Sequence, residues 1–170
     1  TINLFADGDN AYLLDHNFTT GDSRIFIIDL TNLSAPTVAS VIEAGVVVPA
    51  NTPHLAAVNG YLYFVHTDGL GVADVRNPAN PVVTVLPQPS LDLYNATFWA
   101  DNQRLYLEMT AEPCPTAFYV YSLENPALPR RTTSTQLTGC GQTLQVNVPN
   151  GDAFYRVSDM FGLSEYTFEV

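Results

Sequence analysis

Apolar and polar residues alternate in short runs along most of the chain. Three such runs are "RIFIIDL", "GLGVADV" and "AFYVYSL", at residues 24–30, 69–75 and 117–123. Successive side chains of a strand point to opposite faces, so a period of two predicts β-strands. No segment places apolar residues at i, i+3 and i+4, the spacing of an amphipathic helix. The pattern therefore predicts an all-β protein with almost no helix.

Each run leads into a similar segment: "DLTNLSAPTVAS", "DVRNPANPVVTV" and "SLENPALPRRTT". The residues that recur in these segments are Asn32, Asn77 and Asn125, then Pro78 and Pro126, then Pro36, Pro81 and Pro129. Proline lacks an N–H and fixes φ, so it suits a turn or the first residue of an edge strand. Asparagine favours turns because its side chain bonds to nearby backbone. A repeated turn between two strands is expected here.

A second element recurs upstream of each run. The stretches "FADGDNAYLLD", "AVNGYLYFVH", "ADNQRLYLEM" and "VPNGDAFYRV" each place Asn, Asp or Gly between two apolar segments. Asn-Gly and Asp-Gly are strong hairpin signals because both residues accept positive φ. Each unit is therefore expected to contain four strands. We expect units at about 1–48, 54–88, 95–138 and 143–170, together one domain, and four-stranded repeats of this size are typical of β-propeller blades.

At these residues the chain resembles the LVIVD-repeat β-propeller family, in which such a strand is followed by Asn-Pro-x-x-Pro. The matching stretches are "GVADVRNPANPV", "IFIIDLTNLSAP" and "FYVYSLENPALP". The first unit departs at Leu33, where the family prefers proline. The resemblance recurs in successive units and covers essentially the whole chain. It implies a secreted or surface protein of bacteria or archaea, and it implies no catalytic residues.

The fourth unit stops before an Asn-Pro turn and an outer strand. A propeller that does not close leaves an unpaired strand edge. Three interpretations remain open. The chain is a fragment of a larger propeller, a neighbouring subunit supplies the missing strand, or the last blade has three strands in a small closed ring.

Charge narrows the range of partners. The chain of 170 residues has six arginines, no lysine and 17 acidic residues, for a net charge of −11. Such a surface cannot neutralise phosphates, so neither nucleic acid nor anionic lipid is an expected partner. With 46% hydrophobic residues the chain is expected to fold. No apolar run approaches the roughly 20 residues of a membrane span.

The two cysteines, Cys114 and Cys140, stand beside proline or glycine in turn-like sequence. Neither belongs to a Cys-x-x-Cys pair or has a histidine nearby, which argues against zinc. An even count in loops predicts one disulfide and hence an oxidising, extracellular compartment.

Few residues suggest chemistry. His54 begins a strand expected to line a propeller channel, and Trp99 is the best candidate for stacking against a sugar; both are candidate ligand-binding residues. The histidines lack the spacing of a metal site. No Gly-x-Ser-x-Gly elbow, phosphate loop or carboxylate pair is present. We therefore predict no catalytic residue, metal or cofactor.

These observations favour an extracellular, non-enzymatic β-propeller module at the cell surface. It would bind a protein partner or another copy of itself, with an unpaired sheet edge as the candidate contact. Two alternatives stay open. One is a propeller enzyme, a hydrolase or lyase with a site in the channel, and the other is a carbohydrate-binding surface module.

Overall fold

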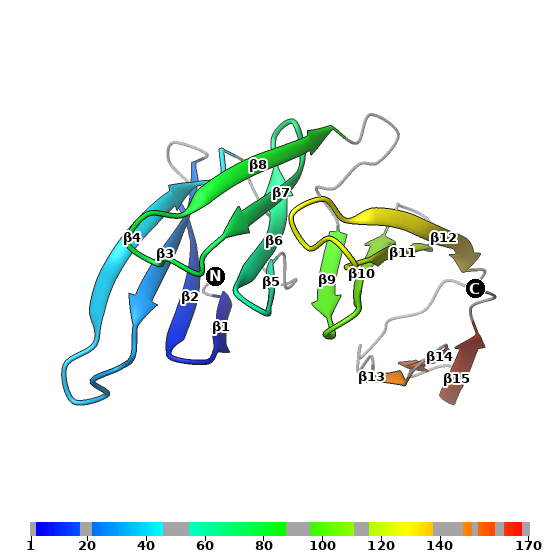
Figure 1. Cartoon of the computed structure of the whole chain (residues 1–170). Coiled ribbons are helices and arrows are strands. Elements are labelled where there is room, and N and C mark those ends of the chain that lie inside the picture. The colour runs from blue at the N-terminus through cyan, green and yellow to red at the C-terminus, as the bar shows by residue number, and fades with distance from the viewer. Residues whose placement is uncertain are drawn as a thin grey trace.

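The computed structural model describes residues 3–17, 22–45, 55–87, 96–110, 116–137, 148–150, 153–158 and 162–167. These residues form antiparallel strands and contain no helix, which confirms the all-β prediction. The strands make three sheets of four strands and a further sheet of three (Figure 1). Within the described residues these sheets do not close into a ring, and the first and fourth stand at opposite ends of the array (Figure 1).

Within every sheet the strands follow one another in chain order. The first sheet contains β1 (Asn3–Asp7), β2 (Asn10–His16), β3 (Ser23–Asp29) and β4 (Thr37–Glu43). The second contains β5 (Leu55–Val58), β6 (Tyr61–His66), β7 (Gly69–Asp74) and β8 (Val82–Pro87). The third contains β9 (Ala96–Ala100), β10 (Arg104–Thr110), β11 (Thr116–Ser122) and β12 (Arg130–Leu137). The fourth contains β13 (Val148–Asn150), β14 (Ala153–Ser158) and β15 (Gly162–Thr167).

Tight hairpins join the first two strands of a sheet. In the first sheet Asp7 pairs with Asn10 across a two-residue loop, and Gly8 has a φ of 58°. In the second sheet the loop is Asn59-Gly60, with φ of 53° and 75°. Two consecutive positive φ values match the right-handed twist of paired strands, which is why Asn-Gly occurs here.

The first three sheets share one turn between their third and fourth strands. The backbone N–H three residues after the asparagine donates to the asparagine carbonyl: Ala35 to Asn32, Asn80 to Asn77 and Leu128 to Asn125, each at 3.0 Å. The outer strand then begins directly after a proline: β4 after Pro36, β8 after Pro81 and β12 after Pro129. Each proline stands outside the strand ladder, where its missing N–H costs nothing.

A polar side chain at the end of the third strand prepares this turn. Its oxygen accepts the backbone N–H two residues later: Asp29 from Thr31 at 2.8 Å, Asp74 from Arg76 at 3.2 Å and Ser122 from Glu124 at 3.2 Å. The side chain of Arg76 also donates to Asp74, and this hydrogen bond is the main reason that the pKa of Asp74 lies below its usual value. These groups therefore act as structural caps.

The hairpin and the Asn-Pro turn lie at the same end of each of the first three sheets. The residue after the cap donates its backbone N–H to the hairpin: Leu30 to Asp9 at 2.8 Å, Val75 to Gly60 at 2.9 Å and Leu123 to Gln103 at 2.7 Å. The repetition of this bond shows that the three units share one internal geometry as well as one strand order.

Each of these sheets has two faces, which we name by the tyrosine of its second strand. Tyr12, Tyr63 and Tyr106 occupy the same register position, opposite Ile27, Val72 and Val120. All three are fully buried, and burial raises their pKa above the usual value. We call the face that carries the tyrosine the tyrosine face and the other the reverse face.

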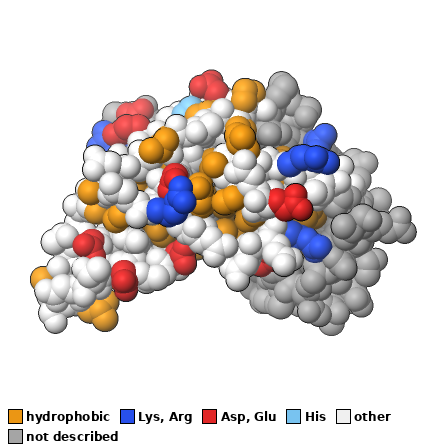
Figure 2. Space-filling view, in the orientation of Figure 1, with side chains coloured by type: hydrophobic (Ala, Val, Ile, Leu, Met, Phe, Trp, Pro, Cys, Tyr) orange, Lys and Arg blue, Asp and Glu red, His pale blue; other side chains and the backbone are white. Residues whose placement is uncertain are grey.

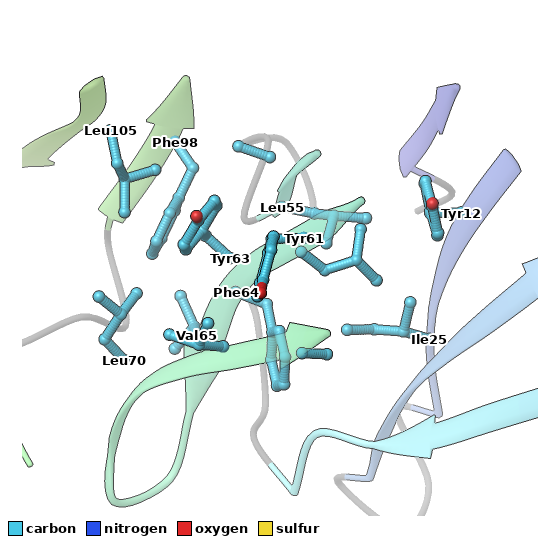
Figure 3. Packing of buried hydrophobic residues seen from close by; sticks show 14 of the residues in the cluster. Tyr12, Ile25, Leu55, Tyr61, Tyr63, Phe64, Val65, Leu70, Phe98 and Leu105 are labelled. Atoms are coloured by element: carbon cyan, nitrogen blue, oxygen red, sulfur yellow. The ribbon is translucent and has the colours of Figure 1, made fainter. Parts of the chain in front are cut away.

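The sheets stack with the tyrosine face of one against the reverse face of the next. The main core cluster takes residues from the tyrosine face of the first sheet, from both faces of the second and from the reverse face of the third. Figure 3 shows Tyr12 and Ile25 on one side of the second sheet, with Phe98 and Leu105 on the other. The second sheet is thus covered twice, and β6 and β7 are buried over almost their whole length.

Hydroxyl groups of the tyrosine faces tie each sheet to the turn of the following unit. Ser40 pairs with Ile27 and donates to the carbonyl of Pro78 at 2.5 Å. Tyr63 donates to the carbonyl of Pro126 at 3.0 Å. The acceptor is in both cases the residue after the turn asparagine, so the two interfaces between sheets are built alike.

Candidate interaction site

The reverse face of the first sheet carries the same kind of apolar surface as the faces buried inside the stack. Its middle row crosses all four strands by direct pairing: Leu4, Leu13, Phe26 and Val41. A second row contains Ala6, Ala11, Ile28 and Val38. Of these residues none belongs to the main core cluster, whereas Tyr12 and Ile27 on the other face do.

Exposure separates this face from its counterparts. Leu4 is 63% exposed, while Leu55 and Phe98, which hold the same place in the second and third sheets, are 0% exposed. Val38 and Val41 of the outer strand are 57% and 42% exposed, but outer strands are exposed elsewhere too, since Val83 holds the place of Val38 in the second sheet and is 41% exposed. The difference at Leu4 arises because a tyrosine face covers the other two reverse faces, and within the described residues no sheet covers this one.

The Asn-Pro turn of the first unit extends the same surface. Leu33 is 79% exposed and stands where Pro78 and Pro126 accept hydroxyl groups from the preceding sheet. Of the large hydrophobic side chains exposed in the described residues, the first unit contributes Leu4, Leu33, Val38 and Val41. Figure 2 shows apolar side chains over this end of the array.

A row of charges borders the face at the end away from the turn. Asp15, Arg24 and Glu43 pair across β2, β3 and β4. The Arg24 Nε and Glu43 Oε2 atoms are 3.3 Å apart in an exposed ion pair. Such a pair contributes little to stability. The charged row forms one border of the apolar surface and so limits its extent along the strands.

Trp99 lies in β9 on the tyrosine face of the third sheet. Its ring stacks on Phe118 with centroids 6.5 Å apart and an interplanar angle of 25°, beside Tyr106 and Val120. This half-buried position gives Trp99 a packing role. His54 lies outside the described residues, as do Cys114 and Cys140. The disulfide and both ligand-binding assignments remain predictions.

Histidine and acidic side chains of the described residues do not gather into a metal site. Among them, no group of three or more His, Cys, Asp and Glu side chains could hold a metal ion. His16 Nδ1 lies 3.0 Å from Ser23 Oγ at the end of β2, and Asp68 donates its backbone N–H to His66 Nδ1 at 3.1 Å. Both contacts fix loop ends. In this part of the chain no helix has the length and apolar character needed to cross a membrane.

The interaction face was not among the residues singled out from the sequence, although a signal for it exists. In the stretch Ala11-Tyr12-Leu13-Leu14, the residues that point to either face of the strand are apolar. The same holds for Leu62-Tyr63-Phe64-Val65 in the second unit. A strand that is apolar on both faces is typical of burial between two layers. The first sheet has this pattern with only one covering layer among the described residues.

No protein-family model matches the chain, and no curated protein matches it significantly. Among solved structures it is similar to a chain in the complex of an S. cerevisiae Dbp5 variant bound to Nup159, a Gle1 variant, IP6 and ADP. That match has 14% identity and a TM-score of 0.46, and covers 96% of this chain and 46% of the other. A likeness at this level carries no argument about function, and the LVIVD-repeat assignment stays a prediction.

Proposed function

We propose that the chain is a non-enzymatic β-propeller module that binds protein through the reverse face of its first sheet. Self-association of the chain through this face is the form of binding that can be measured on the purified protein. The carrying observation is the exposure of Leu4 at a position that the second and third sheets bury completely, with Val38 and Val41 exposed on the same face. An exposed apolar patch bordered by charges is typical of a protein-interaction site.

Two further observations support the propeller part of the proposal. The first strands of the first three sheets are neighbours in order, β1 with β5 and β5 with β9, as expected of blades arranged around an axis. The shared Asn-Pro turn is the element on which the LVIVD-repeat resemblance rests. We place the protein outside the cell, at or near the cell surface, on this resemblance and on the predicted Cys114–Cys140 disulfide.

The face is a stronger candidate contact than the outer edges of the first and third sheets. The outer strands β4 and β12 both shift register against their neighbours, between Ile27 and Ile28 and between Val120 and Tyr121. Bulges of this kind distort an edge and oppose the addition of another strand. No described geometry favours the hydrolase, lyase or carbohydrate-binding alternatives.

The test replaces exposed apolar residues with charge. Leu4→Asp/Val41→Asp is expected to weaken self-association at least 100-fold, because two carboxylates would have to be buried in an apolar contact. Both side chains are substantially exposed, so the fold should survive. Sedimentation velocity over a range of concentrations measures the association.

Leu128→Asp is the matched control, because Leu128 is 54% exposed in the turn of the third unit and lies off the face. It should leave association unchanged. The proposal fails if the wild-type protein stays monomeric at high concentration, or if the control weakens association as much as the face variant does.

A further inference from the structure

We infer that the outer edge of the second sheet is a further binding site, which takes an extended peptide segment of another protein as an added strand. The inference goes beyond the proposed function, because it concerns β8 and not the reverse face of the first sheet. The second sheet packs on one face against the first sheet and on the other against the third. The framework that holds this edge is therefore described on both sides.

The outer strand of the second sheet differs in its register from the other two outer strands. In the first and third sheets one residue of the outer strand is passed over in the pairing with the third strand, Ala39 in β4 and Thr132 in β12. In contrast, β8 pairs with β7 residue by residue over its whole length, from Val82 to Pro87. A regular edge is a template for a further strand, whereas a bulge twists an edge away from such pairing.

The strand β8 also lacks the charges that protect the edge of the third sheet. Val82 and Val83 are 65% and 41% exposed, and Thr84 is exposed as well. The positions of the two valines are held in the third sheet by Arg130 and Arg131. Natural sheets use charged edge residues and bulges to prevent the addition of a strand. Of the four-stranded sheets in the described residues, the second is the one whose outer strand has neither.

The backbone of this edge is available for pairing. In a strand with one neighbour, alternate N–H and C=O groups point away from that neighbour. Among the described strands, β8 has β7 as its only neighbour and forms the outer border of the second sheet (Figure 1). An added strand would pair with the outward groups and extend the sheet. Because β6 and β7 are buried over almost their whole length, the edge is fixed before binding, which lowers the entropic cost of association.

The side chains of the edge define the core of the segment that fits it. Val82 and Thr84 lie on the tyrosine face of the sheet and Val83 lies on the reverse face. An added strand therefore meets apolar or β-branched neighbours on both faces, and cross-strand pairs of β-branched residues stabilise a sheet. Pro81 precedes the strand and Pro87 ends it, and neither has an N–H to donate. The paired core of the segment is thus about five residues long.

Charge selects the residues that flank this core. The chain has a net charge of −11 and no lysine. The side chain of Asp68 is 79% exposed, and Asp68 stands directly before Gly69, which pairs with Pro87 at the end of β8. A basic residue beside the core would meet this carboxylate, and a basic segment is attracted by the charge of the whole chain. The expected ligand is a short β-branched segment flanked by lysine or arginine.

A synthetic peptide serves as the probe. Its core is Val-Thr-Val-Thr-Val, with two lysines on each side and a fluorescent label. Fluorescence anisotropy, recorded while the full chain is titrated into the peptide at about 0.15 M salt, should show saturable one-to-one binding. The same peptide N-methylated throughout its core is the control for strand addition. It should bind about 10-fold more weakly or worse, because it has lost the N–H donors of the added strand.

Two variants of the chain test the place of binding. An alanine inserted between Val83 and Thr84 recreates the bulge of the other two sheets without a change of charge, and should weaken binding about 10-fold or more. Val82→Arg copies Arg130 of the third sheet and should have a similar effect. Thr37→Arg is the matched control, since Thr37 holds the place of Val82 on the bulged strand β4 and is also exposed. It should leave peptide binding unchanged.

Circular dichroism checks that each variant is folded, and if one of the two β8 variants does not fold, the other decides. Weaker binding in the β8 variants with unchanged binding in Thr37→Arg supports the inference. Equal weakening by Val82→Arg and Thr37→Arg indicates general charge attraction and overturns it. The inference is also wrong if the wild-type chain does not bind the peptide, or binds the N-methylated peptide equally well. The same holds if a folded variant with the inserted alanine binds like the wild type.

Self-association of the same proteins, measured by sedimentation velocity without peptide, tests the other occupant of the edge. The inserted alanine should leave self-association unchanged. If it abolishes self-association, the edge is filled by a second copy of the chain and the peptide inference is wrong. The proposed function is tested separately at Leu4 and Val41, which none of these variants alters, so the failure of one proposal is distinguishable from the failure of the other.

Discussion

Raising the pH from about 9 to 12 is expected to unfold the protein cooperatively, since its core holds tyrosines that cannot ionise in place. Burial, assisted by the nearby charge of Asp7, raises the pKa of Tyr12 to about 12. Burial likewise raises the pKa of Tyr106 and of Tyr121 to about 12. The pKa of Tyr63 is raised further in the same direction, again chiefly by burial.

The sign follows from proton linkage. A folded-state pKa above the unfolded value of 10.0 means that the unfolded chain releases its protons first as the pH rises. The contributions of Tyr12, Tyr106 and Tyr121 to stability are therefore complete below pH 10 and are lost between pH 10 and 12. At about 1.4 kcal/mol per pH unit per group, three such tyrosines remove about 4 kcal/mol per unit. That loss exceeds the stability of many domains within about two units.

Circular dichroism and the absorbance of tyrosinate, recorded together during alkaline titration, measure this effect. Both signals should change in one transition, because ionisation of the buried rings requires unfolding. Tyr12→Phe removes one of the groups and should reduce the slope of stability against pH by about 1.4 kcal/mol per unit. Tyrosinate absorbance that develops fully near pH 10 while the fold persists would contradict the account.

Phe64→Ala is expected to lower the free energy of unfolding by about 3–5 kcal/mol, the usual cost of removing a fully buried aromatic ring. Phe64 is 1% exposed, and its ring lies where a Cβ at Gly71 would overlap it. The two residues pair across β6 and β7 on the reverse face that packs against the first sheet. Gly71→Val should therefore cost about 1–3 kcal/mol through overpacking.

The double variant Phe64→Ala/Gly71→Val should cost less than the sum of the two single changes, because the valine occupies space that the ring leaves. Urea unfolding of the four proteins gives a coupling energy, expected at about 1–3 kcal/mol in favour of the double variant. Leu13→Ala is the control at the register position of Phe64 in the first sheet. Measured on monomeric protein it should cost well under half as much as Phe64→Ala, since no sheet of the described residues covers Leu13. Simple additivity would show that Phe64 and Gly71 do not share the packing described.

Local sequence carried much of the fold. The prolines at 36, 81 and 129 and the asparagines at 32, 77 and 125 act within a few residues of themselves, through fixed φ and short hydrogen bonds. Turn chemistry of this kind needs no tertiary partner, so it can be recognised in a sequence. The alternation in 24–30, 69–75 and 117–123 likewise predicted the third strand of each of the first three sheets. Closure into a propeller could not be decided in this way, because it depends on the angles between sheets.

The candidate site was not predictable to the same extent. Leu4 and Leu55 are both leucines in the first strand of a unit, and nothing in their neighbours tells that one is 63% exposed and the other 0%. The single tryptophan, Trp99, was predicted to be a candidate ligand-binding residue because an indole ring can stack against a sugar. Its stacking on Phe118 became visible only once β9 and β11 were placed in one sheet.

The sequence by itself determined the strands, the two kinds of turn and the repetition of the unit, since these depend on backbone preferences and on contacts between near neighbours. Only the tertiary structure decided which faces are covered. Burial is a property of what lies against a sheet, and the same apolar row is core in the second sheet and open surface in the first. The difference between a folding element and a candidate binding site was therefore set by the order in which the sheets stack.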